Sequence, residues 1–367
     1  MKLICSQRTL ASSIHIVQKA VSSKTTLPIL KGILLETCGQ KLKLIGTDLE
    51  IGIEHCIDAE IFSPGAVVLS SRILGDIIRK LPDAEVEIEV DEEKNTIIRC
   101  ENSEFTLIGQ PAVEFPELPI VEEEEGYILP QDLLKNMIKQ TVFATAMDET
   151  RPILTGVLME LQEKSINMVA LDGYRLALRQ ASIANTKNNK AVIPGKTLNE
   201  VNRILMDEEE SNLEIFFTDK HILFNMKEIR IISRLLEGDF INYQQIIPKE
   251  YKSRVKVNTK SLLDSIERAS LLAKEGKNNL VKFSVKDEKM TITSNAEIGK
   301  VFESVNIELE GDDIDIGFNS KYFLDALKVI DSEELYLEFT TSVSPCIVKP
   351  TDHGNYTYLI LPVRLVN

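Results

Sequence analysis

One stretch of the chain occurs twice, and this duplication constrains the fold more than any other feature. Residues 28–36 read PILKGILLE, and residues 152–160 read PILTGVLME. The same spacing of 124 residues (152 minus 28) aligns Asp48 with Asp172 without an insertion. A match held at one spacing over so many positions indicates an internal duplication. A chain of 367 residues has room for three copies.

Two irregular segments divide the chain into three predicted domains. Residues 116–126 combine prolines with an acidic run, and residues 247–252 interrupt the pattern a second time. We therefore predict domains at residues 1–120, 127–246 and 254–367. The third copy lacks the PIL signature, but its helix at 321–330 aligns with 196–205 at a spacing of 125 residues (321 minus 196).

Each predicted domain contains two helices separated by short strands. Apolar periodicity predicts helices at residues 7–20, 71–81, 131–142, 196–205, 260–274 and 321–330. Ser70 and Ser71 are predicted to cap the second helix. Short β-branched runs, such as the strict alternation at 85–90, predict antiparallel strands. The predicted fold class is α+β, with three tandem repeated domains.

Composition excludes several classes of protein. The chain is 43% hydrophobic and 27% charged, and no apolar run approaches the ~20 residues of a membrane span. The N-terminus turns polar at once, so we expect no secretory signal and a cytoplasmic location. Five cysteines and four histidines are widely scattered, so we expect no metal, cofactor or disulfide framework.

Positive charge is concentrated on the predicted helices, although the net charge is −15. The second helix of each domain has two basic residues seven positions apart, which places both on one helix face. These pairs are Arg72 and Arg79, Lys196 and Arg203, and Lys321 and Lys328. The first helices add Lys135, Lys139 and Arg268.

Two interpretations of this charge are open. Lysines on polar helix faces often serve solubility, and Asp76, Glu200 and Asp325 lie in register to neutralise part of the charge. Recurrence in three domains favours one shared basic surface instead. Such a surface would bind duplex DNA through its phosphates, without reading sequence.

The chain has none of the common catalytic motifs. There is no GxxxxGK[ST], no GxGxxG after a strand, no GxSxG and no HExxH. Asp48 and Asp172 could form a carboxylate pair for a hydrolase. An aspartate that bonds its own backbone in a turn is the favoured alternative, so we predict that the chain is not an enzyme.

At the level of whole segments, the chain resembles the bacterial DNA sliding clamps, the β subunits of DNA polymerase III. The matching segments are residues 26–30, 46–50, 172–176, 317–319 and 361–365, and they extend over the whole chain. The resemblance implies a head-to-tail homodimer whose six domains close into a ring, with twelve helices around duplex DNA. It further implies a processivity factor that tethers the replicative polymerase, the clamp loader and other proteins. A peptide-binding scaffold of the same fold that does not encircle DNA is the alternative.

The resemblance also assigns site residues. A partner-peptide cleft between the second and third domains would comprise Arg151, Leu154, Leu171, Gly173, Tyr174, Arg175, Leu176, Ile246, Asn319, Tyr322, Val343, Ser344, Leu361, Pro362, Val363, Arg364 and Leu365. The resemblance also adds Lys24 to the basic helix residues listed above, and we call this set the DNA-facing residues. Phe105 and Leu107 would meet Leu271 and Leu272 of a second copy, unless these side chains are interior. Ile241 and Gln245 depart from the Pro and Arg of relatives, and Val366 and Asn367 extend the usual terminus.

Overall fold

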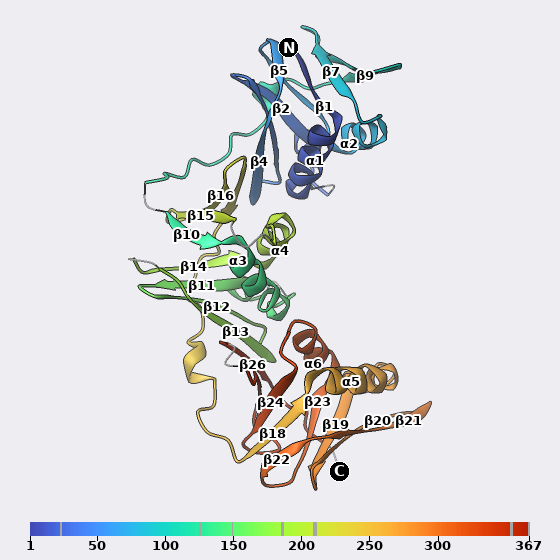
Figure 1. Cartoon of the computed structure of the whole chain (residues 1–367), viewed down its shortest axis with the longest axis vertical. Helices are drawn as coiled ribbons and strands as arrows, with labels where there is room; N and C mark the ends of the chain where they lie inside the picture. Colours follow the sequence, from blue (N-terminus) through green and yellow to red (C-terminus); the bar gives the residue numbers. More distant parts are fainter. Residues whose placement is uncertain are drawn as a thin grey trace. The chain divides into compact units, whose positions relative to one another are not determined.

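The computed structural model describes residues 1–22, 24–124, 126–148, 150–184, 187–207, 211–352 and 355–365. The chain forms two compact units. Met1–Leu133 and Glu200–Leu235 make the first, and Leu134–Asn199 and Leu236–Asn367 make the second. Each unit contains two antiparallel sheets (Figure 1). Val366 and Asn367 lie outside the described residues.

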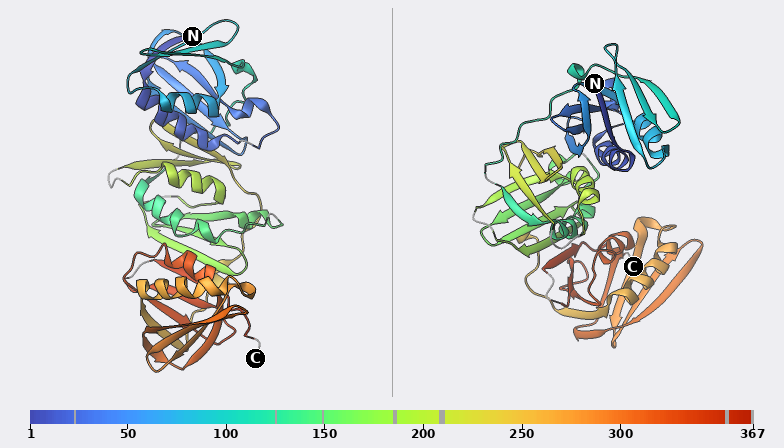
Figure 2. Two further views of the ribbon diagram at one scale, coloured as in Figure 1. Left: turned by 90° about the vertical axis from the view of Figure 1, so that its right-hand side faces the viewer. Right: turned by 45° about the horizontal axis from the view of Figure 1, so that its top comes forward.

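The first unit is built on a five-stranded and an eight-stranded sheet. The smaller sheet has the order β5 (Glu60–Ser63), β1 (Lys2–Ser6), β7 (Glu85–Val90), β8 (Asn95–Cys100) and β9 (Ser103–Ile108). The larger has the order β10 (Tyr127–Pro130), β15 (Asn212–Phe217), β16 (His221–Met226), β17 (Ile229–Arg234), β4 (Ile51–Asp58), β3 (Lys41–Thr47), β2 (Gly32–Cys38) and β6 (Ala66–Ser70). Helices α1 (Gln7–Val17) and α2 (Ser71–Lys80) pack side by side (Figure 2).

The second unit repeats this plan with a nine-stranded and a four-stranded sheet. The larger has the order β14 (Asn189–Pro194), β11 (Gly156–Gln162), β12 (Ser165–Leu171), β13 (Arg175–Ser182), β26 (Tyr356–Ile360), β25 (Cys346–Pro350), β24 (Glu334–Phe339), β18 (Ser253–Asn258) and β22 (Glu308–Gly311). The smaller has the order β21 (Gly299–Asn306), β20 (Lys289–Ala296), β19 (Leu280–Lys286) and β23 (Ile314–Asn319). Helices α5 (Thr259–Ala273) and α6 (Ser320–Leu327) pack against each other.

The predicted helices are confirmed, with bounds that are slightly shorter or shifted by one residue. The second repeat supplies α3 (Gln131–Lys139) and α4 (Gly195–Ile204). Most of their apolar residues are buried, as are most of those of α1 and α2, because period-3.6 spacing places them on one face, whereas Ile73 of α2 is 42% exposed. Strands β1 and β5 were not predicted. The cap prediction is wrong for Ser70, which occupies the N-cap position of α2 without a side-chain hydrogen bond. Within the described residues, no helix is both long and apolar enough to cross a membrane.

The duplicated stretch folds the same way in both copies. Each PIL signature forms a 3-10 turn, η2 (Pro28–Lys31) and η5 (Pro152–Thr155), before a strand begins at a glycine. Each copy then continues its sheet onto a strand of the following domain. In the first unit β4 pairs with β17, and in the second β13 pairs with β26. We call these two places the first and second junctions.

The repeated aspartates are turn residues, as favoured above. The Asp48 Oδ1 accepts hydrogen bonds from the backbone N–H groups of Glu50 and Ile51, at 3.1 and 3.0 Å. The Asp172 Oδ1 accepts from Tyr174 and Arg175, at 2.9 and 3.1 Å. Each carboxylate therefore holds its own backbone turn, and neither is arranged as an acid–base group.

Candidate functional site

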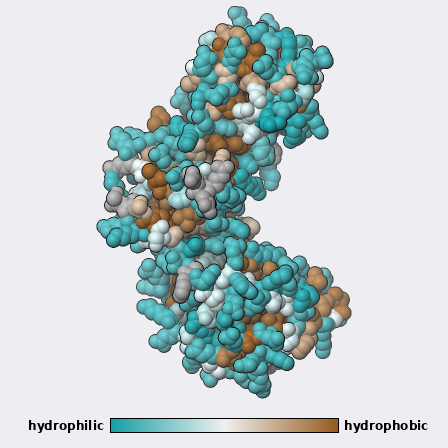
Figure 3. Space-filling model, in the orientation of Figure 1, coloured by the Kyte–Doolittle hydropathy of each residue, from teal (hydrophilic) through white to brown (hydrophobic). Residues whose placement is uncertain are grey.

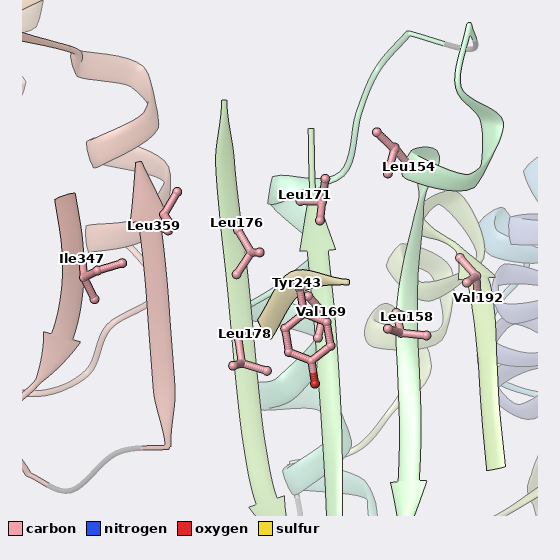
Figure 4. Close-up of a cluster of buried hydrophobic side chains, with 10 residues drawn as sticks. All are labelled: Leu154, Leu158, Val169, Leu171, Leu176, Leu178, Val192, Tyr243, Ile347 and Leu359. Atoms are coloured by element: carbon pink, nitrogen blue, oxygen red, sulfur yellow. The ribbon is translucent and has the colours of Figure 1, made fainter. Parts of the chain in front are cut away.

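An apolar cluster lies on the sheet at the second junction. Leu171 of β12 pairs with Leu176 of β13, which pairs with Leu359 of β26. The cluster comprises Leu154, Leu158, Val169, Leu171, Leu176, Leu178, Val192, Tyr243, Ile347 and Leu359 (Figure 4). The register of three strands thus joins apolar side chains of two domains. Leu154, Leu171 and Leu176 are the predicted site residues within it.

Several other predicted site residues present exposed side chains around this junction. Tyr174 is 61% exposed, Val343 68%, Ile246 38% and Leu361 36%. The Leu361 N–H donates to the Tyr174 carbonyl at 2.8 Å, which ties the C-terminal segment to the turn between β12 and β13. Gly173 lies in that turn with a φ of +92°, a conformation that favours glycine.

Arg175 is the buried centre of the site. Its guanidinium donates to Asp172 Oδ2 at 3.0 Å, to Asp325 Oδ2 at 2.5 Å and to the Phe143 carbonyl at 2.7 Å. Only 8% of its side chain is exposed. The contacts connect β13 with α6 and with η4 (Val142–Ala144), because the planar guanidinium offers donors in several directions.

Aromatic rings surround this guanidinium. The Arg175 guanidinium carbon lies 4.7 Å from the centre of the Tyr322 ring, and Tyr322 stacks on Tyr174 with ring centres 6.1 Å apart. The Tyr358 hydroxyl donates to the Tyr322 carbonyl at 3.0 Å. Burial alone would lower the pKa of Arg175. The opposing effect of Tyr358, Asp325 and Asp172 is larger, so the pKa of Arg175 lies above its ordinary value. The cation is therefore permanent.

The C-terminal residues are bonded to β23 of the same domain. The Val363 N–H donates to the Gly317 carbonyl at 2.8 Å. A Cβ at Gly317 would lie 2.7 Å from Leu365 Cδ2, so this glycine permits a close approach of the two segments. Asn319 caps α6 by accepting from the Lys321 N–H at 3.0 Å. Pro362 is half-buried and Arg364 is exposed.

The two remaining predicted site residues are in exposed or turn positions. Arg151 is exposed, and its carbonyl accepts from the Leu154 N–H at 3.0 Å. The hydroxyls of Ser344 and Thr341 lie 2.6 Å apart in the loop before β25. Sequence reasoning missed Phe143, Tyr243, Asp325 and Tyr358, because their roles depend on contacts between distant segments. The repetition of Asp172, which accepts a hydrogen bond from Arg175, was the sequence feature that pointed to this group of contacts.

The predicted DNA-facing side chains are almost all exposed. Lys24, Arg72, Arg79, Lys139, Lys196, Arg203, Arg268, Lys321 and Lys328 are exposed, whereas Lys135 is half-buried. Arg79 pairs with Asp76 and Arg203 with Glu200, both three residues apart on one helix. Arg268 pairs with Glu303 of β21, and Lys328 with Glu267 of α5. Local carboxylates therefore offset part of the positive charge.

Other cations keep their charge uncompensated. In the part of the chain that the structure describes, Lys24, Arg72, Lys139 and Lys321 form no ion pair. The expectation for Asp325 is wrong: it pairs with Arg175, so it does not neutralise its helix. Arg72 and Arg79 also line, with Lys31, a hollow of about 530 Å³ next to α1 and α2. Asp76, the partner of Arg79, also lines this hollow.

Two sheet edges carry exposed apolar side chains. Strand β9 is the last strand of its sheet, with Phe105 40% and Ile108 85% exposed. Strand β21 is the last strand of another sheet, with Phe302 71% exposed. Leu271 of α5 is 67% exposed, and Leu107 and Leu272 are half-buried. Most of the visible surface is hydrophilic, and one of several hydrophobic patches lies at the lower right, where Figure 1 labels the β20–β21 hairpin (Figure 3). The alternative that these predicted interface side chains lie in the interior of the chain is therefore wrong for Phe105 and Leu271.

Three tandem domains of this kind define the class of DNA clamp proteins, and comparisons with known proteins agree. Models of the N-terminal, central and C-terminal domains of the DNA polymerase III beta subunit match residues 1–119, 128–242 and 244–364. The chain belongs to the DNA polymerase III beta-subunit family, the bacterial sliding clamps. As a sliding clamp, it is a processivity subunit and has no catalytic role of its own.

Individual relatives are similar over their whole length. The Beta sliding clamp of Bacillus subtilis is 43% identical, with 99% of this chain and 100% of the relative covered. The crystal structure of the DNA polymerase sliding clamp from Bacillus subtilis has a TM-score of 0.96 at 42% identity, covering 100% of both chains. A sliding clamp from Pseudomonas aeruginosa bound to griselimycin has a TM-score of 0.94 at 29% identity, also covering 100% of both chains.

Proposed function

We propose that two copies of this chain close head to tail into a ring around duplex DNA in the cytoplasm. The ring would tether the replicative polymerase, the clamp loader and other proteins through short peptides. The observation that carries this proposal is the charge distribution. The chain has a net charge of −15, yet in the part that the structure describes five α-helices, α2 to α6, each carry an exposed or half-buried cation of the predicted DNA-facing set. A cationic inner surface attracts phosphate without reading bases, and the acidic remainder repels it.

The second junction supports the proposed peptide site. A short peptide is held well by an apolar surface that takes one or two anchoring side chains, with a few polar groups at its rim. The exposed apolar side chains of Tyr174, Ile246 and Val343, which lie around the buried apolar cluster, offer the first. Arg151, Ser344 and Arg364 offer the second. Griselimycin, named as the ligand of the Pseudomonas aeruginosa clamp, is consistent with a ligand site on this fold. We call this the partner site.

Deleting residues 361–367 is expected to abolish binding of a polymerase C-terminal peptide. The deletion removes Leu361 and the strand-like bond from Val363 to Gly317, so one side of the partner site is lost. The dimer should persist because β9, β21 and α5 are untouched. Peptide pull-down together with sedimentation tests this prediction. Retained peptide binding would remove these residues from the partner site.

The sheet edges support the proposed dimer. Among the described strands, β9 pairs with β8 alone and β21 with β20 alone. Such edges pair readily with another chain, especially when they carry apolar side chains. Pairing β9 of one copy with β21 of the next would continue the sheet and cover Phe105, Ile108 and Phe302. This contact is heterologous, so two of them would join two chains head to tail into a ring when the rotation between the copies closes.

Replacing Leu271 and Leu272 together by alanine is expected to yield folded monomers. Both leucines are partly or largely exposed in the single chain, so their truncation should cost the fold little. Each anchor of an interface can contribute more than about 2 kcal/mol, which corresponds to roughly thirtyfold in the dissociation constant. Sedimentation velocity measures the result, with Ile120→Ala, 91% exposed, as control. An unchanged dimer would exclude these leucines from the interface.

The domain boundaries and the choice between alternative functions are also part of this proposal. The domain boundaries at residues 120, 127, 246 and 254 are proposed from the irregular segments. A peptide-binding scaffold that never encircles DNA is the alternative function, and it does not explain why exposed cations recur on the helices of all three domains. No observation favours the hydrolase, because Asp48 and Asp172 each hold a turn.

A further inference from the structure

The segment at residues 115–123, which includes most of the predicted linker at 116–126, is packed on the first unit. Phe115 is 6% exposed and Val121 4%, and Leu118 packs against both of the apolar groups they join. The anchors are three residues apart, and Phe115 has φ −79° and ψ 131°. Polyproline II has three residues per turn, so such spacing puts all three anchors on one side. Glu123 accepts hydrogen bonds from Arg230 and Asn225.

This segment lies at the first junction, on a surface that corresponds by register to the partner site. Thr47, Gly52 and Ile232 pair across three strands, as Leu171, Leu176 and Leu359 do at the second junction. The next strand continues the correspondence, because Ile232 pairs with Leu223 and Leu359 pairs with Ile347. Leu223 and Ile232 belong, with Phe216, to the cluster that packs with Val121.

The covering segments correspond as well. At a spacing of 125 residues, Phe115 aligns with Phe240 (240 minus 115), Leu118 with Tyr243, and Val121 with Ile246. Phe240 and Tyr243 pack against the apolar cluster. Both junctions therefore consist of a duplicated apolar surface and a duplicated segment that crosses it.

The two copies differ in how far the segment covers the surface. At the first junction, Gly52 leaves room for Leu118, because a Cβ there would lie 2.4 Å from Leu118 Cδ2. Leu176 takes the position of Gly52 at the second junction. Its own side chain fills that space, so the crossing segment cannot use it.

The crossing residue of the second junction is held elsewhere. The Tyr243 hydroxyl donates to Glu160 at 2.7 Å and accepts from Asn167 at 3.4 Å. Its ring lies next to Val169 and Leu178, with the hydroxyl pointing away from Leu171 (Figure 4). Ile246 remains 38% exposed, whereas Val121 is almost completely buried.

We propose that residues 115–123 act as a built-in ligand, which permanently occupies at the first junction the counterpart of the partner site. Each chain therefore offers one site to partners and not two. Gly52, Leu118 and Val121 determine that the first junction is closed. This inference rests on the proposed function of the second junction as the partner site.

Releasing the segment should uncover a second peptide site. The variant Leu118→Ser with Val121→Ser removes two of the three anchors, and Ile120→Ser is the matched control in the same segment. The probe is a fluorescent peptide of residues 115–124, FPELPIVEEE. We expect the double variant to bind one more peptide per chain than the wild type and the control. Equal numbers of bound peptides for all three proteins would overturn the proposal.

A second variant tests the same proposal without depending on whether the Leu118→Ser, Val121→Ser protein folds. Gly52→Leu fills the space under Leu118 without changing the segment, so the segment should be displaced. Cleavage at Glu122–Glu124 by a glutamyl endopeptidase should then accelerate by about tenfold or more, because the cleavable open state is more populated. An unchanged cleavage rate would contradict the proposal.

The polymerase peptide separates this inference from the proposed function. If the wild type binds that peptide and the double variant gains no second site, only the built-in ligand is wrong. If the wild type does not bind it, the partner site itself is wrong. The binding measurement is made on the full chain in both cases.

Discussion

Replacing Arg175 by alanine is expected to lower the free energy of unfolding by about 3–5 kcal/mol, the cost of breaking a buried ion pair from one side. The substitution leaves Asp172, Asp325 and the Phe143 carbonyl without their shared donor. Tyr322 also loses the cation on its face, so the stacked Tyr174 should become mobile. We expect affinity for a polymerase peptide to fall together with stability.

The matched control is Arg203→Ala. Arg203 also pairs with a carboxylate three residues away, but its side chain is 63% exposed. An exposed pair contributes at most about 1 kcal/mol, so this variant should unfold almost like the wild type. Urea denaturation of both variants measures the difference. Equal effects would mean that Arg175 does not organise the site.

Much of the fold was predictable because it follows from local patterns and from the duplication. Helices were found from apolar spacing, and the turn role of Asp48 and Asp172 from their position after a strand. The duplication aligned the two PIL signatures, and the structure shows that they form the equivalent turns η2 and η5. These features depend on neighbours in sequence, where the pattern carries the information.

The site was less predictable because it depends on register between distant strands. Arg175 and Asp325 are 150 positions apart, and nothing local indicates that they pair. Asp325 has the right spacing to neutralise its own helix, yet the buried guanidinium is the stronger partner because water does not screen it. The segment at 115–123 has the composition of a linker, and only the sheet surface beneath it explains its three anchors.

The strongest functional prediction is that topology retains this protein on DNA. Exposed cations on the helices give a diffuse, salt-sensitive attraction to phosphate, which alone would not hold a protein at physiological salt. A closed ring needs no strong contact, because it leaves only over a free end. Reversing Arg72, Arg79, Lys196, Arg203, Lys321 and Lys328 to glutamate should therefore impair assembly on DNA by repulsion.

A matched control changes the same amount of charge elsewhere. Lys164, Lys220, Lys227, Lys252, Lys286 and Lys289 are exposed and lie outside the α-helices. Their reversal to glutamate gives the same net charge as the helix variant. We expect this control to assemble on DNA nearly as well as the wild type. If both variants fail equally, net charge and not the helix surface is responsible.

Retention on circular against linear DNA tests the central claim most directly. The wild-type dimer is loaded onto a nicked circular plasmid with a clamp loader, separated from free protein by gel filtration, and the plasmid is then cut once with a restriction enzyme. We predict that the protein remains on the intact circle and leaves within the time of the column once the DNA is linear. Equal retention on both forms, or immediate loss from the circle, would contradict a ring that encloses DNA.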